Sequence, residues 1–232
     1  RFESEAQVTA SLTSPHTIRL YDFGVADDGR FYYVMELLDG EDIEALVARA
    51  GALPVARVVH LLRQACHSLA EAHERGLMHR DIKPANLFVC RMGLDADVVK
   101  VLDFGLVQEV ERDPGQDLTQ SLAGLEGIVG TPAFMAPEMI AGDRAIDRRA
   151  DIYALGCVAH VLLTGQPVFQ STTPMQVLID HATTTPQPPS ARAPQPVPAW
   201  LDALVLACLE KDPDRRPPTA SALVERLSGH DD

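Results

Sequence analysis

The chain has few positive charges and no long apolar run. Its 20 lysine and arginine residues are outnumbered by 33 aspartate and glutamate residues, which gives a formal net charge of -13 at pH 7. Phosphate backbones require clusters of basic side chains, so this balance argues against nucleic acid as a partner. The longest apolar run, residues 152–163, is too short to span a bilayer and predicts a buried helix. With 232 residues, 46% of them hydrophobic, the chain suits one sizeable globular core.

Cysteine is also scarce, and its spacing argues against two kinds of site. The four cysteines are far apart and form no CxxC pair; they are Cys66, Cys90, Cys157 and Cys208. We therefore expect reduced core thiols in a cytoplasmic protein rather than disulfides or a metal site. No signal peptide is visible. The chain begins with Arg1 rather than methionine, so we expect it to be a piece of a longer protein.

Hydrophobic periodicity predicts two strands near the start of the chain and helices after them. Alternating residues rich in β-formers predict strands at 18–25 and 31–37, and glycine or proline clusters mark the breaks. The helical spacing of apolar residues predicts helices at 2–12, 58–72, 150–164, 200–210 and 220–227. Residues 109–130 read as a polar loop, and the proline-rich residues 184–198 read as an extended connector.

The most informative stretch is HRDIKPAN at residues 79–86, followed by DFG at 103–105. The first segment supplies an acidic residue, Asp81, a basic residue, Lys83, and an amide, Asn86, within eight residues. This is the equipment for phosphoryl transfer, in which catalysis is mostly positioning and charge neutralisation.

Two strand-like runs separate Asn86 from Asp103, and a hairpin would bring these two residues together. We expect Leu87 to face Leu102 across this hairpin, which places Asn86 and Asp103 side by side at its open end. An amide oxygen beside a carboxylate suits a hard cation such as magnesium.

These segments resemble the protein kinase family, of the serine/threonine type and close to its bacterial branch. Six segments match in the family's order: the HRD loop ending at Asn86, DFG at 103–105, GTP at 130–132, APE at 136–138, DIYALG at 151–156 and DRRP at 214–217. The resemblance implies an α+β, two-lobed fold with a truncated small lobe and a mostly helical large lobe. Residues 1–38 would be the remnant of the small lobe, a helix and two strands. Residues 39–232 would be the large lobe, with the catalytic loop and the activation segment.

The resemblance also implies roles for four residues of the two central segments. Asp81 would be the catalytic base that accepts the proton of a serine or threonine hydroxyl on a protein substrate. Lys83 would neutralise charge on the transferred phosphoryl group of ATP, and its position resembles serine/threonine rather than tyrosine kinases. Asn86 and Asp103 would hold magnesium ions.

Five further residues correspond to the nucleotide site. Met35 resembles the gatekeeper at the end of its strand, and Glu36 and Leu38 would offer backbone groups to adenine. Asp42 falls where an acidic residue often meets the ribose. Phe88 matches a position beneath the adenine, although a simple core residue is the alternative.

Other matches concern regulation and structure. An arginine at the position of Arg80 usually pairs with a phosphate on the activation segment. Thr119 and Ser121 are candidate acceptors of this phosphate, and the alternative is that both are ordinary solvated loop residues. Thr131 more simply forms hydrogen bonds with Asp81 and Lys83. The resemblance assigns structural roles to an ion pair between Glu138 and Arg216, to Asp151 as the carboxylate that holds the catalytic loop, and to His79 as a packing residue.

Two parts of the pattern are missing. The chain has no Gly-rich loop, and none of its three lysines, Lys83, Lys100 and Lys211, lies upstream of the catalytic loop. Glu5, which would pair with the missing lysine, lacks its partner. One hypothesis is a fragment of an active kinase that binds ATP poorly and is nearly inactive by itself. The alternative is a non-catalytic, pseudokinase-like interaction module.

Overall fold

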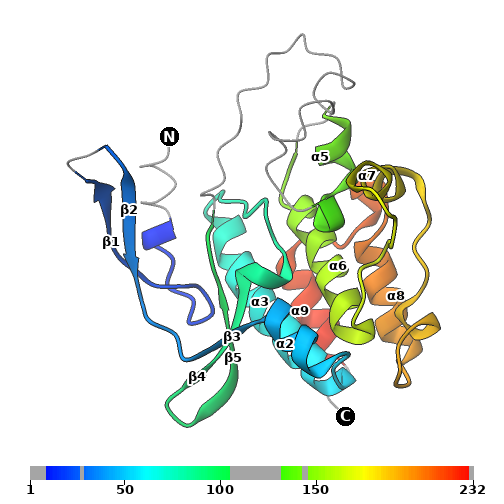
Figure 1. Ribbon diagram of the computed structural model, residues 1–232, viewed down its shortest axis with the longest axis horizontal. Helices are drawn as coiled ribbons and strands as arrows, with labels where there is room; N and C mark the ends of the chain where they lie inside the picture. The colour runs from blue at the N-terminus through cyan, green and yellow to red at the C-terminus, as the bar shows by residue number, and fades with distance from the viewer. Residues whose placement is uncertain (1–8, 27–28, 105–131, 143–145, 230–232) are drawn as a thin grey trace.

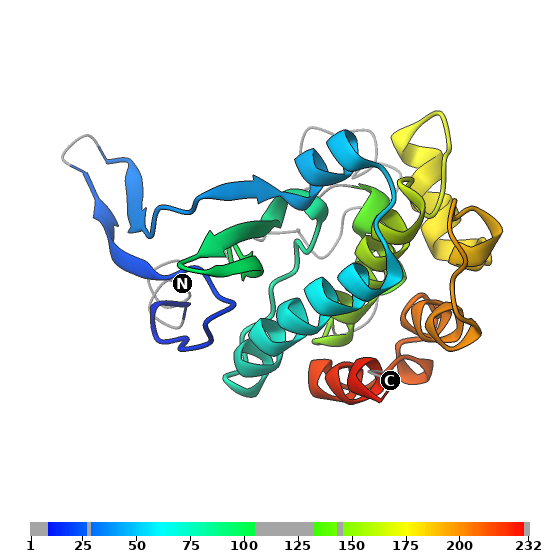
Figure 2. The same ribbon diagram turned by 90° about the horizontal axis from the view of Figure 1, so that it is seen from below.

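The computed structural model describes residues 9–26, 29–104, 132–142 and 146–229. Its strands form two separate antiparallel sheets (Figure 1). One sheet pairs β1 with β2, and the other has the order β3-β4-β5. The strands are β1 (Leu20–Val25), β2 (Phe31–Met35), β3 (Gly40–Asp42), β4 (Leu87–Met92) and β5 (Asp95–Val101). Figure 2 shows the three-stranded sheet between the β1–β2 pair and the helices.

The other regular elements of the described residues are helices. They are α2 (Ile43–Ala50), α3 (Val55–Glu74), α5 (Pro137–Ala141), α6 (Arg149–Thr164), α7 (Pro174–Thr183), α8 (Ala199–Cys208) and α9 (Ala220–Ser228). The predictions of helices at 58–72, 150–164, 200–210 and 220–227 are confirmed as α3, α6, α8 and α9. Only the end of the helix expected at 2–12 falls within the described residues, and the loop expected at 109–130 lies outside them.

Helix α6 is the centre of the core. All of its residues from Ala150 to Thr164 are buried, as expected for a helix that is apolar on every side. It packs against α3 and α8. The contact with α8 requires Gly156, because a Cβ atom there would lie 2.7 Å from the Cβ of Cys208. Gly165 ends the helix in the left-handed conformation, with φ of 74°.

The four cysteines are buried and unpaired, as the sequence predicted. None of the helices in the described part of the chain has the length and apolar character needed to cross a bilayer. On the β1–β2 pair, the side chains of Tyr32, Tyr33 and Val34 are exposed.

The predicted register of the β4–β5 hairpin was wrong by one residue. Leu87 pairs with Val101 rather than with Leu102. The two strands extend to Met92 and Asp95, so the turn has only two residues and begins at Gly93, with φ of 62°. A two-residue turn fixes the register, and a shift of one residue changes which side chains share a face of the sheet.

Gly40 begins strand β3 and allows its close approach to β4. A Cβ atom at Gly40 would lie 2.1 Å from the carbonyl oxygen of Val89, so only glycine allows β3 to approach β4 this closely. The approach ties the segment after β2 to the hairpin that leads into Asp103. Asp42 then caps α2 by accepting a hydrogen bond from the backbone N–H of Ala45 at 2.8 Å.

Candidate active site

The carboxylate of Asp81 is held by two neighbours in the same loop. The Nζ atom of Lys83 donates to Oδ2 of Asp81 at 2.6 Å. A single 3₁₀ turn, Pro84–Asn86, brings the side chain of Asn86 back so that its Nδ2 atom donates to the carbonyl oxygen of Asp81 at 2.8 Å and to Oδ2 at 3.0 Å. The structure therefore brings together the three residues that the sequence placed in the catalytic loop.

Asp103 follows the hairpin and leaves the strand with a positive φ of 56°. The backbone N–H of Leu102 donates to the carbonyl oxygen of Asn86 at 2.9 Å. Asp103 is the next residue after this last backbone contact of the hairpin. Burial raises the pKa of Asp103, the Asp81 carboxylate raises it further, and His79 and Lys83 oppose both effects. Two carboxylates in one partly buried site create a demand for positive charge.

His79 connects this carboxylate to the catalytic loop. The imidazole is buried, its Nε2 atom lies 2.6 Å from the carbonyl oxygen of Leu102, and its ring centroid lies 4.8 Å from that of Phe104. The backbone N–H of Asp81 donates to Nδ1 at 3.3 Å, so Nε2 is the nitrogen that carries the proton and donates. One ring therefore links the loop that carries Asp81 to the segment that carries Asp103.

Asp151, in the first turn of α6, holds the backbone just before Asp81. Its carboxylate accepts hydrogen bonds from the backbone N–H groups of His79 at 2.9 Å and Arg80 at 2.8 Å. Arg80 has a positive φ of 67°, which is costly for a residue with a side chain. Burial by itself raises the pKa of Asp151, but a hydrogen bond from His73 and the nearby imidazoles lower it overall. No role was predicted for His73, because a contact across 78 positions leaves no local signal in the sequence.

The segment expected to meet adenine is fixed by an ion pair that the sequence did not predict. Nζ of Lys100 lies 2.7 Å from Oε1 of Glu36, and these side chains are only 6% and 14% exposed. The same oxygen accepts the backbone N–H of Arg19 at 2.9 Å. Met35, the expected gatekeeper, ends β2 immediately before Glu36. Lys100 therefore joins strand β5 to the segment that follows Met35.

The remaining nucleotide candidates lie close to this pair along the chain. Phe88 is opposite Lys100 in the β4–β5 ladder and is half-buried. Leu38 is half-buried, whereas the neighbouring Leu37 is fully exposed. Asp42 uses one carboxylate oxygen as the cap of α2.

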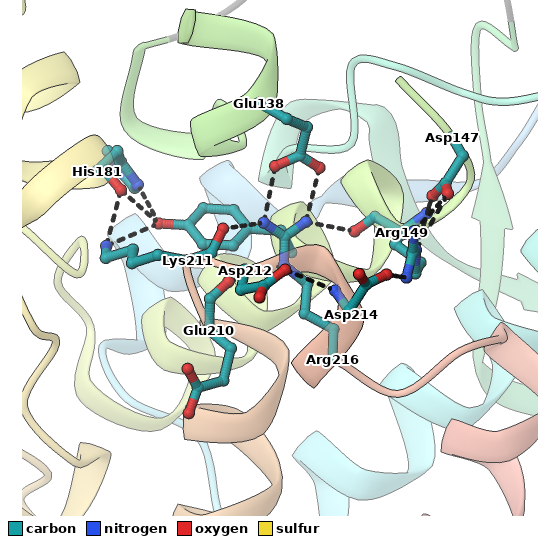
Figure 3. A network of polar contacts seen from close by, with 10 residues as sticks. Glu138, Asp147, Arg149, His181, Glu210, Lys211, Asp212, Asp214 and Arg216 are labelled. Carbon is teal, nitrogen blue, oxygen red and sulfur yellow. Dashed lines mark hydrogen bonds and ion pairs between the residues drawn. The ribbon is translucent and has the colours of Figure 1, made fainter. Parts of the chain in front are cut away.

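A buried network anchors helix α5 to the rest of the described large lobe (Figure 3). Arg216 forms two hydrogen bonds of 2.7 Å with the carboxylate of Glu138, in a pair whose side chains are 0% and 4% exposed. The guanidinium also donates to the carbonyl oxygen of Arg149 at 2.9 Å and lies 4.8 Å from the ring centroid of Tyr153. Phe134 belongs to the short turn that precedes α5.

Thr119 and Ser121, the candidate phosphate acceptors, lie outside the described residues, as do Thr131 and Glu5. Their expected roles stay predictions.

Comparison with known proteins identifies the family. The protein kinase domain family matches residues 1–227. The serine/threonine-protein kinase PknB of Mycobacterium tuberculosis is 37% identical over 226 residues, which cover 96% of this chain and 34% of PknB. The serine/threonine-protein kinase pkn3 of Myxococcus xanthus is 36% identical over 233 residues, covering 100% of this chain and 42% of pkn3. The chain thus spans between a third and a half of the length of these relatives.

Solved structures agree with this assignment. The crystal structure of the M. tuberculosis PknI kinase domain, as a double mutant, superposes with a TM-score of 0.73 at 27% identity and covers 99% of this chain and 76% of that one. The structure of Rad53 in complex with AMP-PNP has a TM-score of 0.74 at 25% identity and covers 97% of this chain and 53% of Rad53. The expected α+β, kinase-like fold is confirmed.

Proposed function

This chain belongs to the protein kinase family, in its bacterial serine/threonine branch, and we propose that it transfers the γ-phosphate of ATP to serine or threonine hydroxyls of protein substrates. The observation that carries the proposal is the geometry of Asp81. The ammonium of Lys83 lies 2.6 Å from its carboxylate and the amide nitrogen of Asn86 lies 3.0 Å from it, so carboxylate, cation and amide are already assembled.

In this mechanism, the substrate hydroxyl oxygen attacks the γ-phosphorus, its proton passes to Asp81, and ADP leaves. Both donors to the Asp81 carboxylate use Oδ2, so Oδ1 is the oxygen that would receive the proton. Lys83 is held beside the reacting centre by its bond to Asp81, where its charge would stabilise the transferred phosphoryl group. Asn86 fixes the loop so that these two side chains keep their relative positions.

Magnesium fits the donor set. Asn86 engages Asp81 through its amide nitrogen, which leaves the amide oxygen as a ligand. Partial burial raises the pKa of Asp103, and a cation beside this carboxylate would keep it ionised. No three His, Cys, Asp or Glu side chains gather into a metal site in the described residues, so phosphate oxygens and water would complete the shell. A bound magnesium ion would neutralise phosphate charge.

The adenine and ribose assignments extend the same proposal. Backbone groups of Glu36 and Leu38 would meet adenine beside Met35, Phe88 would lie beneath it, and Asp42 would meet the ribose. Four buried, unpaired cysteines and the use of ATP agree with a cytoplasmic location. The pseudokinase-like alternative is not favoured, because an interaction module needs none of the contacts made by Asp81.

The test is Asp81→Asn in the natural gene product that carries these residues, assayed for transfer of labelled phosphate from ATP to a serine- or threonine-containing protein. We expect turnover to fall by roughly 10²–10⁴-fold, the usual cost of losing general-base catalysis. Asp95→Asn, at an exposed position in the hairpin, is the matched control and should keep full activity. Near-normal turnover in Asp81→Asn would refute the role of Asp81. A natural protein that transfers no phosphate would favour the interaction module.

A further inference from the structure

Residues 13–18 lie along the edge of strand β5 that β4 does not occupy, and β5 ends two positions before Asp103. A parallel bridge joins this segment to Val101. The backbone N–H of Val101 donates to the carbonyl oxygen of His16 at 2.8 Å, and the backbone N–H of Ile18 donates to the carbonyl oxygen of Val101 at 3.0 Å. The segment therefore extends the sheet at the point from which the chain enters the candidate site.

Two side chains hold the 13–18 segment in place. At its start, the carboxylate of Glu71 in α3 accepts the backbone N–H groups of Thr13 at 2.9 Å and Ser14 at 2.7 Å. Further along, Nδ1 of His16 lies 3.2 Å from the carbonyl oxygen of Val99 in β5. A carbonyl oxygen can only accept, so Nδ1 carries the proton and Nε2 is the nitrogen at which a second proton would bind.

The surroundings of His16 oppose that second proton. Its ring stacks against the ring of His67 in α3, with centroids 6.2 Å apart and planes at 26°. Burial lowers the pKa of His16, although its hydrogen bond to β5 opposes this effect, and the charges of His67, Lys100 and His60 lower it further. Lys100 is fixed in β5 by its ion pair with Glu36. The segment is therefore docked with His16 neutral.

Glu71 has the opposite requirement, because it must be ionised. Its carboxylate also accepts the hydroxyl of Thr13 at 2.8 Å and the guanidinium of Arg75 at 2.9 Å. Burial by itself raises the pKa of Glu71, but the hydrogen bonds from the segment and the charge of Arg75 lower it overall. The start of the segment is therefore held by a carboxylate that accepts four different donor groups.

These two groups respond to acid at different pH values. Once the segment is detached, His16 takes up a proton near pH 6.5, whereas the docked imidazole does not, so docking weakens as the pH falls below 6.5. The contribution of Glu71 is complete above pH 4.5 and is lost only below that value. Between the two limits, the His16 end of the segment loosens while the Glu71 end stays attached.

We propose that His16 is a pH sensor for phosphoryl transfer, whose protonation between pH 6.5 and 4.5 releases residues 16–18 from β5 and lowers activity, while Glu71 keeps the segment attached at its start. The inference rests on the proposed kinase function and concerns its regulation. Release removes both backbone bonds to Val101, and Asp103, which would hold magnesium, lies two residues further along the chain. Return to neutral pH restores the pairing, so the loss of activity is reversible.

His16→Asn tests the sensor directly. An asparagine amide can donate to the carbonyl oxygen of Val99 from near the position of Nδ1, but it cannot gain a charge. We compare kcat at about pH 7.5 and about pH 5.5 in the natural gene product that carries these residues and in the variant. We expect values within about twofold of each other at the higher pH. At the lower pH the natural protein should lose roughly fivefold more activity than the variant, the lower end of the coupling between linked sites.

His160→Asn is the matched control. Burial lowers the pKa of His160 as well, but this histidine lies in α6, where its Nδ1 atom is 3.0 Å from the carbonyl oxygen of Gln166. We expect its ratio of kcat at the two pH values to equal that of the natural protein. An active natural protein with the same ratio as His16→Asn would overturn the proposal and leave the proposed function intact. A ratio that changes equally in both variants would indicate a global loss of stability and would also overturn it.

A second readout does not depend on activity. Hydrogen exchange, measured by NMR and corrected for the intrinsic rate at each pH, reports the protection of the backbone amides of Ile18 and Val101. We expect acid to lower protection at both amides in the natural protein but not in His16→Asn, while the amide of Ser14, which is bonded to Glu71, stays protected in both.

The two readouts together separate the inference from the function on which it rests. The expected exchange pattern in a natural protein that transfers no phosphate would count against the proposed function alone. Protection of Ile18 and Val101 that is the same at both pH values in the natural protein would contradict release of the segment. Acid-dependent protection combined with equal kcat ratios in the natural protein and His16→Asn would show that release does not regulate the site, and the proposal would fail.

Discussion

Replacing Arg216 with methionine should destabilise the protein more than any exposed substitution. The change leaves the Glu138 carboxylate buried without its cation, since that side chain is only 4% exposed. It also removes the donors to the carbonyl oxygens of Glu210 and Arg149. Breaking one partner out of a buried ion pair costs about 3–5 kcal/mol.

The size of this effect can be read from thermal or urea unfolding followed by circular dichroism. For a domain of this length, about 3–5 kcal/mol corresponds to a fall in Tm of roughly 6–20 °C. The control is Asp214→Asn, which removes an ion pair with Arg149 in which the aspartate side chain is 80% exposed. Exposed pairs contribute about 0–1 kcal/mol, so this variant should unfold almost like the natural protein.

The double variant Arg216→Met with Glu138→Met tests the cause. If the loss comes from an uncompensated buried carboxylate, removing that carboxylate as well should restore part of the stability. A single Arg216→Met variant that loses less than about 1 kcal/mol would refute the reasoning, because the carboxylate would then have found water or another donor.

Two further predictions concern buried charges. Lys100→Met should lower the free energy of unfolding by about 2–3 kcal/mol, because it leaves the nearly buried Glu36 carboxylate without its cation. Adding Glu36→Gln to this variant should recover part of the lost stability in a double-mutant cycle measured by urea unfolding, and additive losses would contradict the pairing. Burial, reinforced by the charge of Lys211, lowers the pKa of His181 to about 4. The unfolded chain takes up this proton near pH 6.5 while the folded chain does not, so stability should fall between pH 6.5 and about 4, by about 3 kcal/mol. The fall should be absent in His181→Asn, and equal pH profiles for the two proteins would contradict the assignment.

The parts of the site that the sequence predicted are those made by near neighbours. Asp81, Lys83 and Asn86 lie within six positions, and one short turn is enough to bring their side chains together. The central helix was predictable for a related reason: a run that is apolar on every side can only be buried. Such features depend on local spacing, which the sequence displays directly.

The parts that the sequence did not predict depend on contacts between distant elements. Glu36 meets Lys100 across 64 positions, and His73 meets Asp151 across 78. Neither charge nor spacing distinguishes these residues from other polar side chains on the same elements. Short helices such as α5 and α7 were missed as well, because a helix of one to three turns is stabilised mainly by packing rather than by its own residues. The predicted hairpin register was wrong because the turn at Gly93 has only two residues, which sets the pairing of the two strands.

The first turn of α6 explains how these separate contacts serve one site. From this turn, Asp151 holds the peptide groups before Asp81. In the same turn, the carbonyl oxygen of Arg149 accepts a hydrogen bond from Arg216, which in turn holds Glu138 at the start of α5 (Figure 3). The catalytic loop and the α5 segment are therefore fixed to the same few residues of the most deeply buried helix. A site placed on a rigid element keeps its geometry more closely than one placed on loops alone. It follows that substitutions in this turn should disturb Asp81 and the α5 segment together, whereas substitutions at the far end of α6 should affect stability without affecting the site.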